Sequence, residues 1–299
     1  MEVDAERLHS HVARLSRLPR PAGSSELEQA RVYVSECIDA VGWSVERVTF
    51  QSESKAGTRL GGTNLIARHR EYPPADRPRF CLGAHLDSLP DTPGADDNAS
   101  AVATMLEIAR LLPCDWPDDP QLDLELVVFD LEENGMLGGA AHVQRMKVDA
   151  VDLRGMVSLE MLGYCDHTPN SQALPRALVG MYPETANFIA IIGNQNSHEL
   201  IEQFRTGMQR VRELPVETLA VPSNGEFLQA TRLSDHSPFW DAGYPALMIT
   251  DTSFLRNPHY HLPSDTVETL DMQFLHRVAE GCLSAVRHVM AVGLSTEET

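Results

Sequence analysis

This sequence has few cysteines. It also has no long apolar segment near its start and no linker that would divide it into domains. Five cysteines occur among 299 residues, an odd number without paired spacing, so no disulfide framework is expected. The first 18 residues carry charges throughout, which predicts neither a signal peptide nor a transmembrane segment and favours a cytoplasmic protein. No Pro/Gly/Ser-rich linker or repeat interrupts the chain, and we therefore expect a single domain over residues 1–299.

Positive charge is also in short supply. The chain has 24 Lys and Arg against 43 Asp and Glu, which gives a formal net charge of -19. An acidic surface repels phosphate groups, so nucleic acid and anionic membranes are not expected as partners. A cationic ligand, such as a metal ion or an amine, fits this charge balance.

Several apolar segments have the pattern of buried strands. The runs at 79–84, 124–131 and 155–159 are nearly continuous, as in parallel strands covered on both faces. Further strands are expected at 44–51, 63–69, 187–193 and 245–251, and helices near 8–18, 25–41, 99–112, 197–211 and 271–292. This alternation predicts an α/β fold, a three-layer domain with a central mixed, mostly parallel sheet flanked by helices.

Residue types that bind metals stand at the ends of the three buried runs. His85 and Asp87 follow the first run, Glu132 and Glu133 end the second, and Glu160 follows the third. A pair of glutamates is commonly a solvated turn, but this pair follows eight mostly apolar residues. Open α/β sheets bind ligands outside the carboxyl ends of their strands, so these side chains are expected to meet there.

The segment PGADDNASAV, residues 93–102, opens a helix with two adjacent aspartates. Asp and Asn are common helix caps, but one acid satisfies that role and the second carboxylate is surplus. One of the two carboxylates, Asp96 or Asp97, is therefore expected to bind a ligand, and Asn98 or Ser100 to help start the helix. If Asp97 is the ligand, Asp96 is left to cap the helix or to hold the ligand residues in place.

Two loops near the C-terminus add further candidates. RNPHYHLPSDT supplies Tyr260, His261 and Asp265 after an apolar run, and SDHSPFWDAG supplies Asp235 and His236. For Asp235 and His236, a purely structural role and a role in supporting metal ligands stay equally open.

Taken together, GAHLDS, GADDNAS, LEENGMLGG, SLEMLGY and YHLPSDT resemble the motifs of the co-catalytic di-zinc aminopeptidase family. This family of zinc exopeptidases also includes glutamate carboxypeptidases and glutaminyl cyclases. The motifs occur in the family's order and cover about residues 20 to 290, starting with RPAGS. The resemblance implies the zinc-exopeptidase type of three-layer α/β fold.

The resemblance also implies roles at matching positions. His85 and Glu160 correspond to the ligands of one zinc ion, Glu133 and His261 to those of a second, and Asp97 to the carboxylate that bridges both. Glu132 corresponds to the general base, and Tyr260 to the phenol that stabilises the oxyanion in some members. Asp87 corresponds to the residue that orients the His85 ring.

The residue types agree with this chemistry independently. Zinc accepts imidazole and carboxylate, and the absence of a Cys-rich set in the sequence favours an open catalytic site over a closed structural one. Two positions depart from the family pattern. Glu160 is aspartate in many members, where this carboxylate also lies near the substrate amine, and Ala101 stands where glycine is usual.

The sequence favours an aminopeptidase that releases N-terminal residues from a peptide substrate. A carboxypeptidase or amidohydrolase of the same di-zinc chemistry stays open, with Arg256 as a reader of a substrate carboxylate. A glutaminyl cyclase and a non-catalytic scaffold are weaker alternatives, because every ligand and the base are present. Residues that are candidates for contact with the substrate, besides Arg256, are Tyr164, Met181, Tyr182, Phe227, Phe239 and Trp240.

Overall fold

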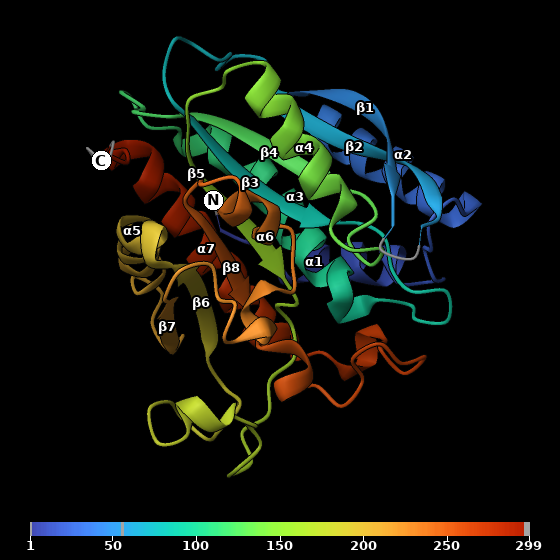
Figure 1. Cartoon of the computed structure of the whole chain (residues 1–299), viewed down its shortest axis with the longest axis vertical. Coiled ribbons are helices and arrows are strands. Elements are labelled where there is room, and N and C mark those ends of the chain that lie inside the picture. Colours follow the sequence, from blue (N-terminus) through green and yellow to red (C-terminus); the bar gives the residue numbers. More distant parts are fainter. Residues whose placement is uncertain (1, 55–56, 296–299) are drawn as a thin grey trace.

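A mixed eight-stranded sheet forms the centre of the molecule (Figure 1). The computed structural model describes residues 2–54 and 57–295. In order across the sheet, the strands are β1 (Trp43–Glu53), β2 (Arg59–His69), β4 (Asp123–Phe129), β3 (Arg79–His85), β5 (Leu153–Glu160), β8 (Ala246–Thr250), β6 (Ile189–Asn194) and β7 (Val216–Val221).

The middle of this sheet is parallel. β3 pairs in parallel with β4 and with β5, and β5 pairs in parallel with β8. The β6–β7 pair is parallel as well, whereas β1–β2, β2–β4 and β6–β8 are antiparallel. The predicted α/β fold with a mixed, mostly parallel sheet is therefore confirmed.

Helices cover both faces of the sheet and explain why the central strands read as continuous apolar runs. One face packs against α1 (Ala5–Leu15), α2 (Ser25–Ala40), α3 (Ala101–Leu111), α5 (His198–Met208) and α7 (Met272–Val292). The other face packs against α4 (Leu137–Val148) and α6 (Ser237–Asp241). Along β3, for example, Phe80 and Leu82 belong to the first core and Cys81 to the second, so both sides of the strand exclude water.

Helix starts follow ordinary capping chemistry where the sequence offers a suitable side chain. Asp4 accepts hydrogen bonds from two backbone N–H groups in the first turn of α1, and Asp271 does the same for α7. None of the described helices is long and apolar enough to cross a membrane.

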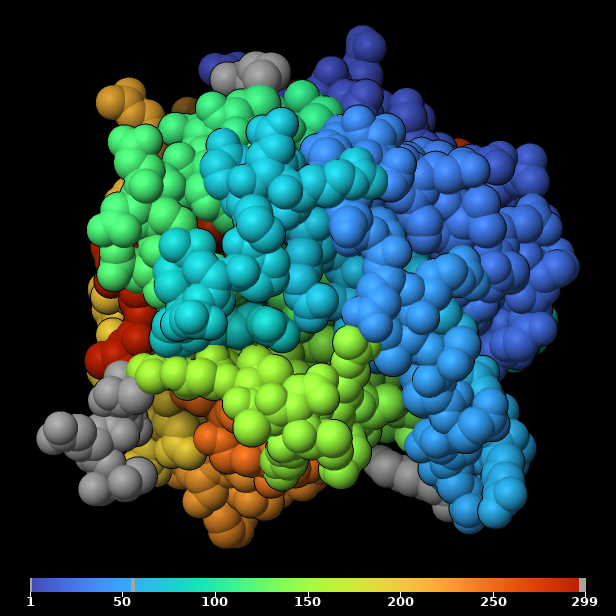
Figure 2. Space-filling view, turned by 90° about the horizontal axis from the view of Figure 1, so that it is seen from above, coloured from blue at the N-terminus to red at the C-terminus, as the bar shows by residue number. Residues whose placement is uncertain are grey.

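The strand β7 is missing from the sequence-based prediction. Its residues alternate only weakly, and most are half-buried, because β7 is the edge strand of the sheet. Seen from above, residues of the first half of the chain cover most of the surface (Figure 2). The segments that follow β5 and β8, in lime and orange, lie together at the lower end of the sheet in Figure 1.

Candidate active site

Three of the predicted ligands meet where β3 and β5 end. His85 is the last residue of β3 and Glu160 the last residue of β5. The His85 Nε2 atom lies 3.2 Å from Asp97 Oδ1 and 3.4 Å from Glu160 Oε2, and all three side chains are buried. The parallel strands therefore gather these groups as the sequence pattern predicted.

A second group shares Asp97 with the first. The His261 Nε2 atom lies 3.2 Å from Asp97 Oδ2 and 3.4 Å from Glu133 Oε2. Asp97 thus directs one carboxylate oxygen to each histidine. The two groups are neighbours, and the Asp97 carboxylate connects them.

The segment that carries Asp97 is held by its backbone. Asp265 accepts hydrogen bonds from the backbone N–H groups of Asp96 (2.9 Å) and Asp97 (3.2 Å). Gly94 precedes the segment with a φ of 69°, and a Cβ atom there would lie 2.3 Å from the Asp97 carbonyl oxygen. Only glycine fits this left-handed, crowded position.

The expected caps of the following helix have other partners. Ala95–Ser100 is an irregular turn, because the backbone at Asp97 and Asn98 is not helical, and it leads into α3 without a capping side chain. The Asn98 side chain instead donates to the Leu159 carbonyl oxygen and accepts from the Met161 N–H, so it links this turn to the end of β5. The expectation that Asn98 or Ser100 helps to start the helix is wrong for the Asn98 side chain, because its amide reaches across to the strand. Ser100 directly precedes α3, but its hydroxyl donates to the Asp96 carbonyl oxygen and does not cap the helix.

Asp87 contacts both the His85 ring and the glutamate pair. The His85 Nδ1 atom lies 3.1 Å from the backbone carbonyl oxygen of Asp87 and 3.6 Å from its carboxylate. The carboxylate accepts hydrogen bonds from the backbone N–H groups of Glu132 (3.1 Å) and Glu133 (3.2 Å). The Asp87 side chain therefore positions the two glutamates, while its main chain contacts the His85 ring.

The chain turns sharply at each ligand segment. Leu131, just before the glutamate pair, Met161, just after Glu160, and His261 itself have φ values of 58°, 47° and 59°. Such left-handed conformations are unfavourable for these residue types. They allow consecutive side chains to leave the strand ends in different directions, so Glu132 and Glu133 are not forced to the same place.

Tyr260 lies beside the second group. Its ring stacks on the His261 ring with centroids 3.7 Å apart, and both residues line the cavity described below. Burial and the nearby Asp97 and Glu160 raise the pKa of Tyr260 above its ordinary value. The phenol therefore keeps its proton and can donate a hydrogen bond.

The electrostatics of the site call for bound cations. Burial raises the pKa of Glu132 well above its ordinary value and raises that of Glu160, and burial together with Asp97 raises the pKa of Glu133 to about 9. For His85, burial alone would lower the pKa, but Glu160 and its other carboxylate neighbours raise it well above the usual range. Buried carboxylates outnumber the cations available to them, and bound metal would remove this imbalance.

The donor set also fits zinc. Imidazole nitrogen and carboxylate oxygen are zinc ligands, and bonds of about 2.0–2.1 Å in a tetrahedral arrangement place neighbouring donors about 3.3 Å apart. The separations of 3.2 to 3.4 Å within each group match this value. In addition, Glu133 Oε1 is buried and has no hydrogen-bond partner among residues 2–54 and 57–295.

The remaining predicted supporting residues lie close by. Asp96 accepts from the Gly163 N–H and from the Asn257 side chain, which joins the Asp97 segment to the loops after β5 and β8. Asp235 is fully buried, and its two carboxylate oxygens have no partner among the described residues. His236 contacts the Thr231 carbonyl oxygen, and burial lowers the pKa of its ring to about 4, so it is neutral and structural.

Three residues proposed to contact substrate are placed elsewhere. Trp240 is buried in the core beneath α6, where its indole N–H donates to the Ala246 carbonyl oxygen. The Arg256 guanidinium is buried and donates to Gln172 and to the Phe188 carbonyl oxygen. Trp240, Arg256 and Tyr164 do not line the cavity, and the Tyr164 ring packs edge-on against the ring of His259.

Of the other residues predicted to contact the substrate, one lines the cavity and three do not. Tyr182 lines the cavity, whereas Phe239 is buried in the core. Phe227 and Met181 are exposed and do not line the cavity.

Sequence reasoning missed several residues that hold the site. Ser234 donates a 2.7 Å hydrogen bond to Glu160 Oε2, and its only signal was its place beside Asp235 and His236. Arg20, in the RPAGS segment, is buried and donates to carbonyl oxygens of Leu86, Pro93 and Gly94, so it fixes the loop before Asp97. Burial lowers the pKa of Arg20 to about 10.

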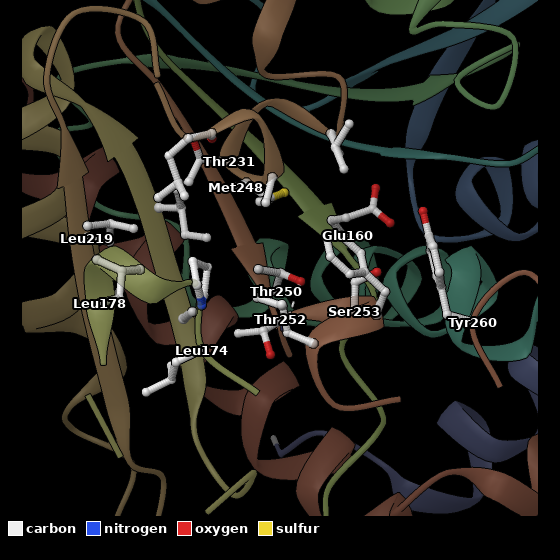
Figure 3. Close-up of a pocket in the computed structure, with 18 of the residues that line it drawn as sticks. Glu160, Leu174, Leu178, Leu219, Thr231, Met248, Thr250, Thr252, Ser253 and Tyr260 are labelled. Carbon is white, nitrogen blue, oxygen red and sulfur yellow. Dashed lines mark hydrogen bonds between the residues drawn. The ribbon is translucent and has the colours of Figure 1, made fainter. Parts of the chain in front are cut away.

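A cavity of about 290 Å³ opens from the two groups (Figure 3). Glu160 and Tyr260 lie at one side, Leu174, Leu178 and Leu219 at the other, and Thr250 and Met248 between them. Asp97, Glu132, Glu133 and His261 complete the acidic side. The arrangement therefore has a polar, ligand-rich end joined to a largely apolar trough, which suits an extended organic substrate.

Several known proteins are similar to this chain in sequence. The chain is 33% identical to the uncharacterized protein YfbL of Escherichia coli, over 93% of this chain and 86% of that protein. It is 26% identical to leucine aminopeptidase 1 of Blastomyces gilchristii, over 82% of this chain, but it spans only 63% of that protein's length.

Solved structures of an aminopeptidase and of a glutaminyl cyclase have the same fold as this chain. A zinc aminopeptidase from Bacillus subtilis superposes with a TM-score of 0.74 at 15% identity, covering 99% of this chain and 97% of that one. A glutaminyl cyclase from Porphyromonas gingivalis superposes with a TM-score of 0.71 at 20% identity, covering 95% and 98%. The family model "Peptidase family M28" matches residues 64–286, which include all five residues of the two groups. This chain belongs to peptidase family M28.

Proposed function

We propose that this protein is an aminopeptidase that binds two zinc ions and hydrolyses the N-terminal peptide bond of a peptide. His85 and Glu160 would hold one ion, Glu133 and His261 the other, and Asp97 both. The observation that carries the proposal is the Asp97 carboxylate, which directs one oxygen to each histidine at 3.2 Å. A peptidase family with leucine aminopeptidase relatives supports the same activity.

The protein's own groups would perform the proton transfers. When bound, the two zinc ions would polarise the scissile carbonyl and make the attacking water more acidic. Glu132, whose pKa is raised by burial, accepts the proton of this water and delivers it to the leaving amine. The Tyr260 hydroxyl donates a hydrogen bond to the oxygen of the tetrahedral intermediate.

The charges of the cavity favour a substrate with a free amine over one with a free carboxylate. Four carboxylates line its ligand-rich end, and no Lys or Arg lines it among the described residues. Arg256, the candidate for binding a substrate carboxylate, does not line the cavity, and its Nε and Nη1 atoms donate to Gln172 and to the Phe188 carbonyl oxygen. An ammonium group is therefore attracted to this end, and a carboxylate is repelled.

Blocking each end of one dipeptide tests the proposal. The free dipeptide and its C-terminal amide are expected to be cleaved, whereas N-acetylation is expected to lower kcat/KM by at least about a hundredfold because a charged hydrogen-bonding group is lost. Chelation should abolish cleavage, and added zinc should restore it. Undiminished cleavage of the acetylated peptide, with loss of cleavage on amidation, would instead identify a carboxypeptidase.

A further inference from the structure

Four strands place two carboxylates at opposite ends of one row of side chains. Glu160 on β5 is paired in register with Thr250 on β8, Thr250 with Ala190 on β6, and Ala190 with Glu217 on β7. Residues paired in this way project from the same face of a sheet, and all four line the cavity. The small side chains of Thr250 and Ala190 leave an open trough between the two glutamates.

Apolar residues surround this trough. The next row along the same strands consists of Met248, Ile192 and Leu219, which also line the cavity. Leu174 and Leu178 line it from the loop after β5 (Figure 3). The trough therefore suits the aliphatic part of a side chain.

Glu217 is an acidic residue at the end of a trough whose other walls are apolar. Its side chain is partly buried, and it forms no ion pair with a Lys, Arg or His among the described residues. Burial raises its pKa above the ordinary value, as expected for a carboxylate without a cationic partner. The nearby Tyr182 hydroxyl is already used, because it donates to the Thr218 carbonyl oxygen at 2.9 Å.

We infer that the cavity selects peptides whose N-terminal residue has a long side chain ending in a cation, arginine or lysine, and that Glu217 binds this cation. The inference rests on the proposed aminopeptidase function. The α-amine lies at the acidic end with Glu132 and Glu160, the aliphatic stem follows the trough, and the side-chain cation meets Glu217. Glu217 is then the residue that determines specificity for a charged over a neutral side chain.

The dimensions agree with this assignment. Neighbouring strands are about 4.8 Å apart, so three steps separate the backbones at Glu160 and Glu217 by about 14 Å. The α-amine and side-chain cation of an extended arginine or lysine lie about 7 Å apart, and charged hydrogen bonds of about 2.8 Å at each end extend the span to about 13 Å. Leucine has no group that reaches Glu217 and would leave its carboxylate unpaired.

Two substrates of similar shape can separate the effect of the side-chain charge from the effect of side-chain size. Citrulline has nearly the shape of arginine but is neutral, so peptides that begin with arginine or citrulline differ mainly in charge. For the wild-type protein, kcat/KM is expected to be at least about tenfold higher for the arginine peptide, as one charge-assisted hydrogen bond provides. In Glu217→Gln this ratio is expected to fall close to one, because kcat/KM for the arginine peptide loses the charge-assisted hydrogen bond.

A surface substitution controls for the change in net charge. Glu36 is exposed on α2 and does not line the cavity, so Glu36→Gln should keep the arginine preference. Calorimetric binding of L-arginine and L-citrulline supplies a measurement that needs no turnover, and L-arginine should bind about tenfold more weakly to Glu217→Gln.

The outcomes separate the two proposals. Cleavage of both peptides without a preference for arginine, or a preference that survives in Glu217→Gln, overturns the inference about Glu217 and leaves the aminopeptidase function intact. Failure to cleave any peptide with a free amine contradicts the proposed function, and equal binding of L-arginine by wild type and Glu217→Gln then overturns the cation site as well.

Discussion

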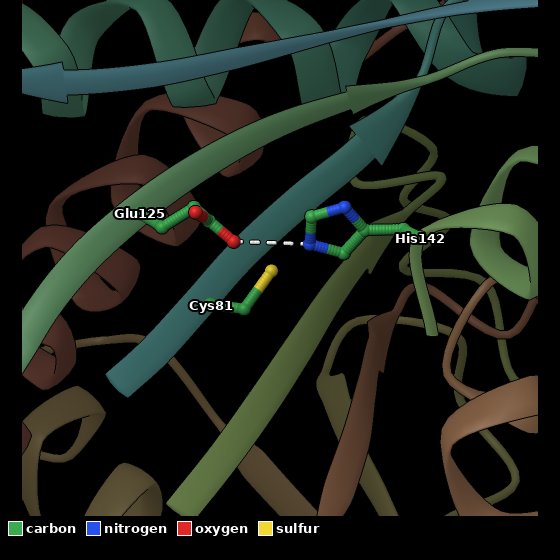
Figure 4. A group of neighbouring side chains, drawn as sticks. All are labelled: Cys81, Glu125 and His142. Atoms are coloured by element: carbon green, nitrogen blue, oxygen red, sulfur yellow. Dashed lines mark hydrogen bonds and ion pairs between the residues drawn. The ribbon is translucent and has the colours of Figure 1, made fainter. Parts of the chain in front are cut away.

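Two groups of side chains in the described part of this protein, one partly and one fully buried, offer similar atoms to a metal ion, yet their surroundings differ. One is the active-site cluster, defined here as His85, Asp97, Glu133, Glu160 and His261. The other is the core cluster of Cys81 on β3, Glu125 on β4 and His142 on α4 (Figure 4). In the core cluster, Glu125 Oε1 lies 3.0 Å from His142 Nε2.

Charge balance distinguishes the two. Arg68 and Arg79 both pair with Glu125, and although burial alone would raise its pKa, His142 and the two arginines lower it to about 2. Burial raises the pKa of the Cys81 thiol well above its ordinary value, so it keeps its proton and is a poor zinc ligand. Within the described part of the chain, the active-site carboxylates form no ion pair with an arginine.

The second difference between the two clusters is whether they can be reached from the cavity. Asp97, Glu133, Glu160 and His261 line the cavity, whereas no member of the core cluster does. A metal site is therefore better recognised by an unbalanced buried charge that faces a cavity than by its residue types alone. The same substitution, Glu to Gln, should have opposite consequences in the two regions.

The largest effect is expected for Glu132→Gln beside the active-site cluster. Gln has the shape of Glu but cannot accept the proton of the attacking water, so kcat should fall about a thousandfold. The free energy of unfolding should not decrease, because the change removes one of several crowded carboxylates. Steady-state kinetics and urea unfolding measure the two quantities. A variant that keeps full activity would show that Glu132 is not the base.

The matched change in the core cluster, Glu125→Gln, should act on stability instead. It leaves Arg68 and Arg79 without their buried partner and should lower the free energy of unfolding by about 3 kcal/mol. The kcat of the folded variant should stay close to that of the wild type. A large fall in kcat without loss of stability would mean that the core cluster takes part in the reaction.

The pH dependence of this difference follows from the pKa of Glu125. The value in the folded protein, about 2, lies below the ordinary 4.5, so the carboxylate stabilises the fold above about pH 4.5. This contribution is lost as the pH falls from about 4.5 toward 2. In the presence of a chelator, the gap in stability between wild type and Glu125→Gln should therefore be largest at neutral pH and shrink below pH 4.5.

Much of the fold, and which residues gather at the site, followed from the sequence, because both depend on local patterns. Continuous apolar runs identified the central strands, and parallel strands necessarily bring the residues at their carboxyl ends, such as His85 and Glu160, to one edge. The family motifs in order identified the same positions, and the match to peptidase family M28 confirms that resemblance. The roles of the individual residues stay predictions.

What the sequence could not predict depends on contacts between distant segments. The Asp87 carboxylate binds the backbone of Glu132 and Glu133, 45 and 46 residues away, and no side-chain pattern encodes that. Glu217 and Glu160 lie in one row on the same side of the sheet because four strands pair in register, and the sequence did not predict β7. Trp240 was expected at the cavity because it follows a candidate loop, but its apolar ring is buried in the core.

The smallest effect is expected for Cys81→Ala in the core cluster. Loss of the buried sulfur should lower the free energy of unfolding by about 1 kcal/mol. If charge balance decides where metal binds, this variant should retain two zinc ions per chain, like the wild type. Asp97→Asn is the matched change in the active-site cluster, where it removes the carboxylate that connects both groups, and it should lose at least one ion.

Zinc content measured by elemental analysis, together with native mass spectrometry, distinguishes these cases. Two ions in Cys81→Ala and fewer in Asp97→Asn would place both in the active-site cluster. Three ions in the wild type and two in Cys81→Ala would show that the core cluster also binds metal, despite the two arginines that neutralise Glu125. Charge balance would then be an insufficient criterion, since the Cys81 thiol would have to lose its proton on binding the metal, at a place that does not line the cavity.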